Sequence, residues 1–312
     1  MSAPTPNSTD SSATPNPTAN IRVGNLPMTL RRPLPQRLLG VWAHPDDEAY
    51  LSAGLMARVV AAGGRVTVLT ATRGEKGTDE PDRYDSDAFG ALREGELRAS
   101  LAVLGVTDVR FLGRRDGECE VGPDEPMVDA IAAVMDELDP DAIVTFGPDG
   151  MTNHADHQAV CRWTTEAWAR RWDGDAGTVI SGPTSAGDLL YATVTNDFAV
   201  RNRELHDRLG VFGDFPTGQP CSVTRDRVAL GCALTDDELD RKRAALAEHA
   251  SQTAGLAALM GENVYRTWYR DETFRRPTAI ELARAAATAE ATTPATDRGP
   301  TGPSAPMLEL AA

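Results

Sequence analysis

Two short segments of the chain combine histidines with carboxylates at close spacing. Such side chains are the usual protein ligands of a catalytic metal, which is held by three residues and keeps one position open for water. The first segment is "AHPDDE" and the second is "TNHADH", and each follows an apolar run. Their candidate residues are His44, Asp46, Asp47, Glu48, His154, Asp156 and His157.

These residue types predict a metal site with two histidines and one carboxylate. His44 would be one ligand, joined by either Asp46 or Asp47 and by either His154 or His157. The acid and the histidine left over would serve catalysis. Zn²⁺ is the expected metal, and Fe²⁺ is the alternative because it accepts the same ligands.

A simpler interpretation is that the acids only cap the helix that follows, where negative charge is favourable. Three of the five histidines of the chain fall in the two segments, however, which favours metal binding. Capping is compatible with it.

The segments around these residues alternate between short strands and longer helices. Apolar runs predict strands at residues 38–43, 65–72, 108–113, 142–147 and 188–194. Helical patterns lie near residues 48–62, 88–104, 125–138 and 156–171, and a capped helix is expected at 234–252. This alternation indicates an α/β, Rossmann-like fold with a mostly parallel sheet and helices on both faces. Its active site would lie at the carboxyl ends of the strands, where both segments begin.

Both ends of the chain differ in composition from its centre. Residues 1–35 are rich in Pro, Ser, Thr and Asn, and residues 286–306 repeat that character. Such segments bury too little apolar surface to order themselves. We therefore expect a disordered tail at 1–35, one folded domain at 36–280 and a largely disordered tail at 281–312.

The overall charge argues against nucleic acid as a partner. The chain has 31 basic and 46 acidic residues, a formal charge of −15, and would be repelled by a phosphate backbone. The four cysteines form no Cys-x-x-Cys pair, and no segment has the pattern of a signal peptide or a membrane span. These features predict a cytoplasmic protein that acts on a small molecule, and they leave a homo-oligomer open.

The combined motifs resemble the PIG-L/LmbE-like zinc deacetylases. The resemblance rests on "AHPDDE" and a later His-x-x-His pair, and it extends to "TRGEKG", "REGELRASLAVLGV", "FLGRRDG" and "KRAALAEHASQ". It implies Zn²⁺ bound by His44, Asp47 and His157, with Asp46 as the general base that activates the metal-bound water.

Further roles are implied by the resemblance. His154 would stabilise the oxyanion of the tetrahedral intermediate, with Asp156 orienting it. Arg93 and Asp116 match positions that contact the sugar in relatives acting on glucosaminyl substrates, and a surface ion pair is the alternative. His249 matches the C-terminal motif and would support the site from the second shell or the rim.

The activity implied by the resemblance is hydrolysis of an N-acyl group, expected to be acetyl, on an N-acetylglucosamine-type small molecule. The main alternative is an amidase that cleaves a thiol-sugar conjugate of the mycothiol type at the same kind of amide. A remote alternative is a sugar-binding module without catalysis, which the complete ligand set opposes.

Overall fold

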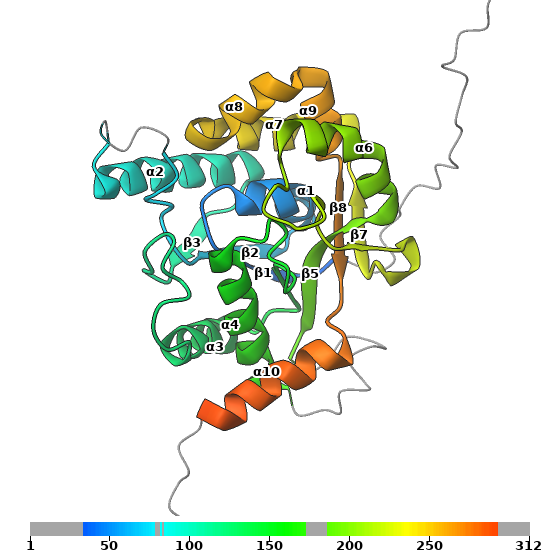
Figure 1. Cartoon of the computed structure of the whole chain (residues 1–312). Coiled ribbons are helices and arrows are strands. Elements are labelled where there is room, and N and C mark those ends of the chain that lie inside the picture. The colour runs from blue at the N-terminus through cyan, green and yellow to red at the C-terminus, as the bar shows by residue number, and fades with distance from the viewer. Residues whose placement is uncertain (1–33, 79–81, 83, 173–185, 293–312) are drawn as a thin grey trace, which may run out of the picture.

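The computed structural model describes residues 34–78, 82, 84–172 and 186–292. The expected tail residues 1–33 and 293–312 lie outside the described residues. The described part forms a central, mostly parallel sheet with helices on both faces (Figure 1), which confirms the predicted fold class.

Five parallel strands form the part of the sheet that the sequence predicted. Across the sheet they lie in the order β3, β2, β1, β4, β5. Their bounds are β1 Arg37–Trp42, β2 Arg65–Thr70, β3 Asp108–Phe111, β4 Ala142–Thr145 and β5 Asp188–Thr195. β1 lies between covered faces, and its residues Leu39, Val41 and Trp42 are fully buried.

Three strands that the sequence analysis did not predict extend the sheet beyond β5. β8 (Asp271–Arg275) pairs antiparallel with β5, and β7 (Leu230–Ala233) pairs antiparallel with β8. The short β6 (Ser222–Val223) runs parallel to the end of β5. β8 reads "DETFR", so charged residues interrupt the apolar pattern on which strand prediction depends.

The helices between the parallel strands are divided over the two faces of the sheet (Figure 1). One face carries α1 (Asp47–Ala61) and α2 (Ser86–Leu104), which both pack against α7 (Asp236–Glu248). The other carries α3 (Glu125–Leu138) and α4 (Ala155–Arg171), with α10 (Ala279–Thr292) packed on α4. The remaining helical segments are α6 (Asn196–Leu209), η1 (Arg225–Arg227), α8 (Ala250–Met260) and α9 (Glu262–Trp268).

Two boundaries differ from the expected ones. The helix expected at 234–252 ends at Glu248, and α8 starts after a break at His249, whose side chain is fully buried. α10 continues through the expected domain end at residue 280, and Leu282 on it is buried. The composition of the C-terminal segment suggested a tail from residue 281. The segment instead continues as a helix, because it is rich in alanine, which has high helix propensity, and because buried Leu282 anchors it.

The strand order places the two motif-bearing loops side by side. The chain adds β2 and β3 on one side of β1 and then crosses to add β4 and β5 on the other. The carboxyl ends of β1 and β4 are therefore neighbours at the switch point of the sheet, where α/β folds bind their ligands. Among the described helices, none is long and apolar enough to cross a membrane.

Candidate metal centre

The loop after β1 turns sharply to aim its two adjacent acids in different directions. Asp46 has a φ of 115°, in the left-handed region, and is the residue before the first turn of α1. Asp47 opens the helix, and its Oδ2 accepts a hydrogen bond from the His44 backbone N–H at 2.8 Å. The Asp47 carboxylate is thus folded back toward His44.

The loop after β4 delivers the second pair of histidines. His154 caps α4, with its Nδ1 accepting a hydrogen bond from the Asp156 backbone N–H at 3.1 Å. His157 follows within the first turn of the helix and is buried. Met151 and Asn153 have φ values of 61° and 62°, so the loop is tightly coiled before the helix begins.

Three of the predicted ligands converge between these loops. His44 Nδ1 lies 3.1 Å from His157 Nε2, and Asp47 lies 3.4 Å from His157 Nε2 and 3.8 Å from His44 Nδ1 by its nearest oxygens. Ligands about 2 Å from one shared metal ion have comparable separations. The three side chains are buried.

The hydrogen-bond partners of the two rings show that the centre fits a cation. His157 Nδ1 lies 2.8 Å from the Gly150 carbonyl oxygen, which only accepts, so this nitrogen carries the proton. His44 Nε2 lies 3.1 Å from Asp116 and 3.2 Å from Asp156, so it donates as well. In their neutral forms the rings therefore point two lone pairs at each other beside a carboxylate, an arrangement that only a cation or an added proton relieves.

The pKa values of the two rings follow from these contacts. Burial lowers the pKa of His44, but its hydrogen bonds with Asp116 and Asp156 outweigh burial and raise the pKa to about 10. Burial and the neighbouring His44 charge lower the pKa of His157 well below its ordinary value. A metal ion bound by both rings would have to displace the added proton that this raised pKa favours on His44.

His154 lies beside this centre and is partly exposed. Its ring meets His44 edge-on, with the centroids 4.8 Å apart, and a ligand atom on each of His44, His154 and His157 lies within 4.8 Å of the others. Because His154 Nδ1 accepts from a backbone N–H, its Nε2 carries the proton of the neutral ring. This N–H is available to a ligand.

Asp46 and Arg93 form the other flank of the centre. Asp46 Oδ2 lies 3.6 Å from Arg93 Nη2. Burial raises the pKa of Asp46 to about 7, although the charge of Arg93 opposes the rise. A carboxyl with this pKa exchanges a proton readily near neutral pH.

Arg93 is buried and is held by the backbone. Its Nη1 donates to the Gly74 carbonyl at 3.0 Å and its Nη2 donates to the Pro45 carbonyl at 2.6 Å. The alternative of a surface ion pair was wrong, because only 3% of this residue is exposed. The guanidinium ties the loop after β2 to the loop after β1, and sugar contact stays a prediction.

Asp116 and Asp156 both serve His44. Asp116 Oδ1 faces His44 Nε2, and its Oδ2 accepts from the Lys76 backbone N–H at 2.9 Å. Asp156 was predicted to orient His154, and its backbone N–H does donate to His154 Nδ1, whereas its carboxylate contacts His44 Nε2 and accepts from the Gly117 N–H. Asp156 therefore contacts both histidines, His154 through its backbone and His44 through its buried side chain.

His249 reaches the centre through Glu48. His249 Nε2 lies 2.8 Å from Glu48 Oε1, and both side chains are fully buried. Glu48 Oε2 accepts a hydrogen bond from the Asp46 backbone N–H at 3.0 Å. The break between α7 and α8 thus places His249 beside Glu48, and Glu48 in turn stabilises the turn at Asp46.

Phe146 and Gly150 were not singled out from the sequence. The Phe146 ring stacks on His157, with centroids 4.1 Å apart and 16° between the planes. Gly150 has a φ of 66° and binds the ring through its carbonyl, and a Cβ there would come within 2.9 Å of the His157 Cβ. The "PDG" turn signals such a glycine, whereas nothing in the sequence signals the stacking.

Comparison with known proteins identifies relatives of the chain. Residues 39–168 match the PIG-L family, described as GlcNAc-PI de-N-acetylase. A protein of Mycolicibacterium gilvum, named 1D-myo-inositol 2-acetamido-2-deoxy-alpha-D-glucopyranoside deacetylase, is 35% identical over 245 residues, covering 72% of this chain and 78% of that protein. A protein of the same name from Kribbella flavida is 34% identical over 254 residues, covering 70% of this chain and 83% of the relative.

A solved structure shares the fold. N,N'-diacetylchitobiose deacetylase from Pyrococcus horikoshii aligns with a TM-score of 0.51 and 18% sequence identity, over 81% of this chain and 88% of that chain. The sequence relatives extend over most of both chains and carry the assignment. The chain therefore belongs to the PIG-L family of N-deacetylases, which are hydrolases acting on amide bonds.

Proposed function

We propose that the chain hydrolyses the N-acyl group of a glucosaminyl-type small molecule, with Zn²⁺ held by His44, Asp47 and His157. The facing lone pairs of the two buried rings beside Asp47 carry this proposal. The names of the relatives, which are deacetylases of an inositol-linked acetamido sugar, support the substrate class. Two nitrogens and one carboxylate suit Zn²⁺, and Fe²⁺ is the alternative metal.

A divalent cation in this centre would polarise the amide carbonyl and acidify a water molecule. Asp46 would take the proton of the attacking water, since burial holds its pKa near 7. The same carboxyl would return the proton to the nitrogen as the C–N bond breaks. The Nε2–H of His154 would donate to the oxygen of the carbonyl as it becomes negative. The products are a carboxylate and a free amine.

The supporting side chains would keep these groups in place. Asp116 and Asp156 fix the His44 tautomer, so that Nδ1 faces the metal. The Gly150 carbonyl fixes the tautomer of His157 in the same way. A sugar-binding module without catalysis would not need a base with a raised pKa beside a complete ligand set.

Two substitutions test the proposal. We expect Asp46→Asn to keep about one zinc per chain while acetate release falls by roughly 10² to 10⁴-fold, the usual contribution of a general base. His157→Ala should lose both zinc and turnover. The measurements are metal content and acetate release from 1D-myo-inositol 2-acetamido-2-deoxy-α-D-glucopyranoside.

Asp237→Asn is the matched control, because Asp237 is exposed in the first turn of α7, away from the centre. It should retain the metal and the turnover of the unchanged protein. Full activity in protein stripped of metal would overturn the proposal.

A further inference from the structure

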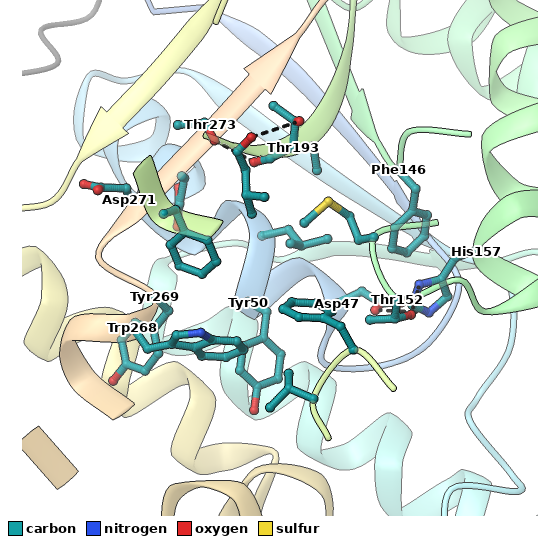
Figure 2. A pocket seen from close by; sticks show the side chains of 18 of the residues that line it. Asp47, Tyr50, Phe146, Thr152, His157, Thr193, Trp268, Tyr269, Asp271 and Thr273 are labelled. Atoms are coloured by element: carbon teal, nitrogen blue, oxygen red, sulfur yellow. Dashed lines mark hydrogen bonds and ion pairs between the residues drawn. The ribbon is translucent and has the colours of Figure 1, made fainter. Parts of the chain in front are cut away.

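A pocket of about 320 Å³ opens directly beside the metal centre. Figure 2 shows Asp47, Thr152 and His157 toward one end of this pocket and Trp268 and Tyr269 toward the other. Most of the remaining wall is apolar. It includes Leu51, Met151, Phe198, Val211, Phe212 and Leu256. The polar residues of the remaining wall are Thr193, Gln252, Asp271, Glu272 and Thr273, of which Glu272 and the Thr273 hydroxyl are already hydrogen-bonded within the protein.

The aromatic end of the pocket is held rigidly. Trp268 Nε1 donates to His206 Nε2 at 2.9 Å, and His206 Nδ1 lies 2.8 Å from Gln219 Oε1. His206 is buried, and burial lowers its pKa, so the ring stays neutral and accepts from the indole. Tyr50 meets the Trp268 ring edge-on. The pocket is therefore formed before any ligand arrives.

The two sides of the metal centre differ in polarity. On the side of β2 and β3, the following loops carry charged side chains that are at least one-third exposed, among them Arg73, Lys76, Arg115 and Glu118. On the side of β5 and β8 lies the apolar pocket. The hydroxyl groups of a sugar bind better to the charged side, because a mostly apolar wall leaves most of them without hydrogen bonds.

We propose that the pocket binds the acyl group of the scissile amide, and that this group is an apolar chain longer than acetyl. The inference rests on the proposed hydrolysis. The carbonyl carbon of the amide is bonded to the sugar nitrogen on one side and to the acyl chain on the other. If the sugar lies on the charged side of the metal centre, the acyl chain therefore points into the pocket. A methyl group, similar in size to a water molecule of about 30 Å³, fills only a small part of it.

The chemistry of the step is that of the proposed function. The oxygen of water joins the carbonyl carbon, the C–N bond breaks, and the proton passes through Asp46 to the amine. The apolar chain adds binding in the pocket, at roughly fourfold in affinity for each buried methylene. The carboxylate product would carry the chain.

The first test compares N-acetyl-, N-butyryl- and N-hexanoylglucosamine as substrates of the zinc-loaded protein. We expect kcat/KM for the hexanoyl compound to exceed that for the acetyl compound by about tenfold or more. A lower value for the hexanoyl compound would overturn the proposal. The proposal would also be overturned if a longer acyl chain had no effect but kcat/KM rose from the methyl to the octyl glycoside of N-acetylglucosamine. The apolar group in the pocket would then belong to the sugar part of the substrate.

A matched pair of variants on α8 tests the location. Leu256 lines the pocket, whereas Leu259 on the same helix is 69% exposed and does not line it. Leu256→Trp should lower kcat/KM for the hexanoyl compound about tenfold more than it lowers kcat/KM for the acetyl compound. Leu259→Trp should change neither value. Equal effects of Leu256→Trp on both substrates would contradict the proposal.

Measuring the binding of the two compounds, without turnover, tests the acyl pocket independently of the proposed function. Calorimetry on zinc-loaded Asp46→Asn should show tighter binding of N-hexanoylglucosamine than of N-acetylglucosamine. If no amide is hydrolysed by the unchanged protein but this difference in binding remains, the proposed function fails and the acyl pocket stands. Equal binding of the two compounds overturns the acyl pocket whatever the turnover.

Discussion

Asp46 adopts a backbone conformation that few residues other than glycine tolerate. A φ of 115° costs on the order of 1–3 kcal/mol, which the surrounding contacts must offset. Glu48 accepts from the Asp46 N–H, and Arg93 binds the Pro45 carbonyl just before it. The strained turn lets the carboxylates of Asp46 and Asp47 point in different directions, as the proposed roles of Asp47 as metal ligand and Asp46 as general base require.

Glu48 is expected to act as a positioning residue for Asp46. Glu48→Ala removes the acceptor of the Asp46 N–H and leaves His249 without its partner. We expect kcat to fall by about tenfold or more, with a smaller change in KM and with zinc retained, because the ligands themselves remain. Steady-state kinetics and metal analysis measure this.

Glu48→Gln is the conservative control, since its amide oxygen still accepts from the Asp46 N–H. It should recover most of the lost kcat. Unchanged kcat in both variants would show that the hydrogen bond does not position the base.

At the residue level, the sequence predicts which side chains gather but not how each is used. The spacing of histidines and acids in "AHPDDE" and "TNHADH" predicts which two loops form the site and which residue types could bind a metal. The separate roles proposed for Asp46 and Asp47 depend on the φ angle of Asp46, which no composition rule anticipates. The partner of Asp156 depends on where α4 docks, and that is a property of the fold.

At the level of elements, the prediction succeeded where strands are buried on both faces. The parallel strands β1, β2 and β4 are mostly buried, largely apolar runs, so their positions and the edge that holds the site follow from the sequence, whereas β3 (DVRF) at the edge of the sheet is only partly buried. The antiparallel strands β7 and β8 have weaker patterns and were missed. They matter for function, because β8 and the helices before it form the far end of the acyl pocket.

The start of α7 is stabilised by a capping box that also contacts α1. Thr235 and Glu238 form the box, and Arg58 on α1 donates to Glu238 Oε1 at 2.6 Å. The hydrogen bond from Arg58, which is the largest cause, lowers the pKa of Glu238 from 4.5 to about 2. Because the folded-state pKa is below the unfolded one, the stabilisation is present above pH 4.5 and is lost as the pH falls toward 2.

We therefore expect Glu238→Gln to lower the free energy of unfolding by about 1–3 kcal/mol at pH 7. The difference from the unchanged protein should shrink as the pH falls from 4.5 to 3.5. Urea unfolding at a series of pH values measures it. Glu248→Gln, at the exposed end of the same helix, is the control and should have little effect. A difference that stays constant with pH would contradict the assigned pKa.

At the level of the whole molecule, the metal centre concentrates negative charge in an already acidic protein. The chain has a net charge of −15, and Asp47, Glu48, Asp116 and Asp156 are all buried near one another. Burying like charges together destabilises the folded state unless cations compensate them. The folded state should therefore bind a divalent cation much more tightly than the unfolded chain does.

Metal binding is expected to stabilise the whole fold. At a Zn²⁺ concentration about 100 times the Kd, linkage adds roughly 2.7 kcal/mol, so chelation should lower Tm by about 5–10 °C. Asp47→Asn should abolish most of this difference, whereas His154→Gln should preserve it, because His154 stands beside the ligand set and caps α4. Thermal unfolding with Zn²⁺ and with chelator measures each variant. The reverse outcome, with His154 required and Asp47 dispensable, would replace the assigned ligands by His44, His154 and His157, whose nitrogens are also close enough to share an ion.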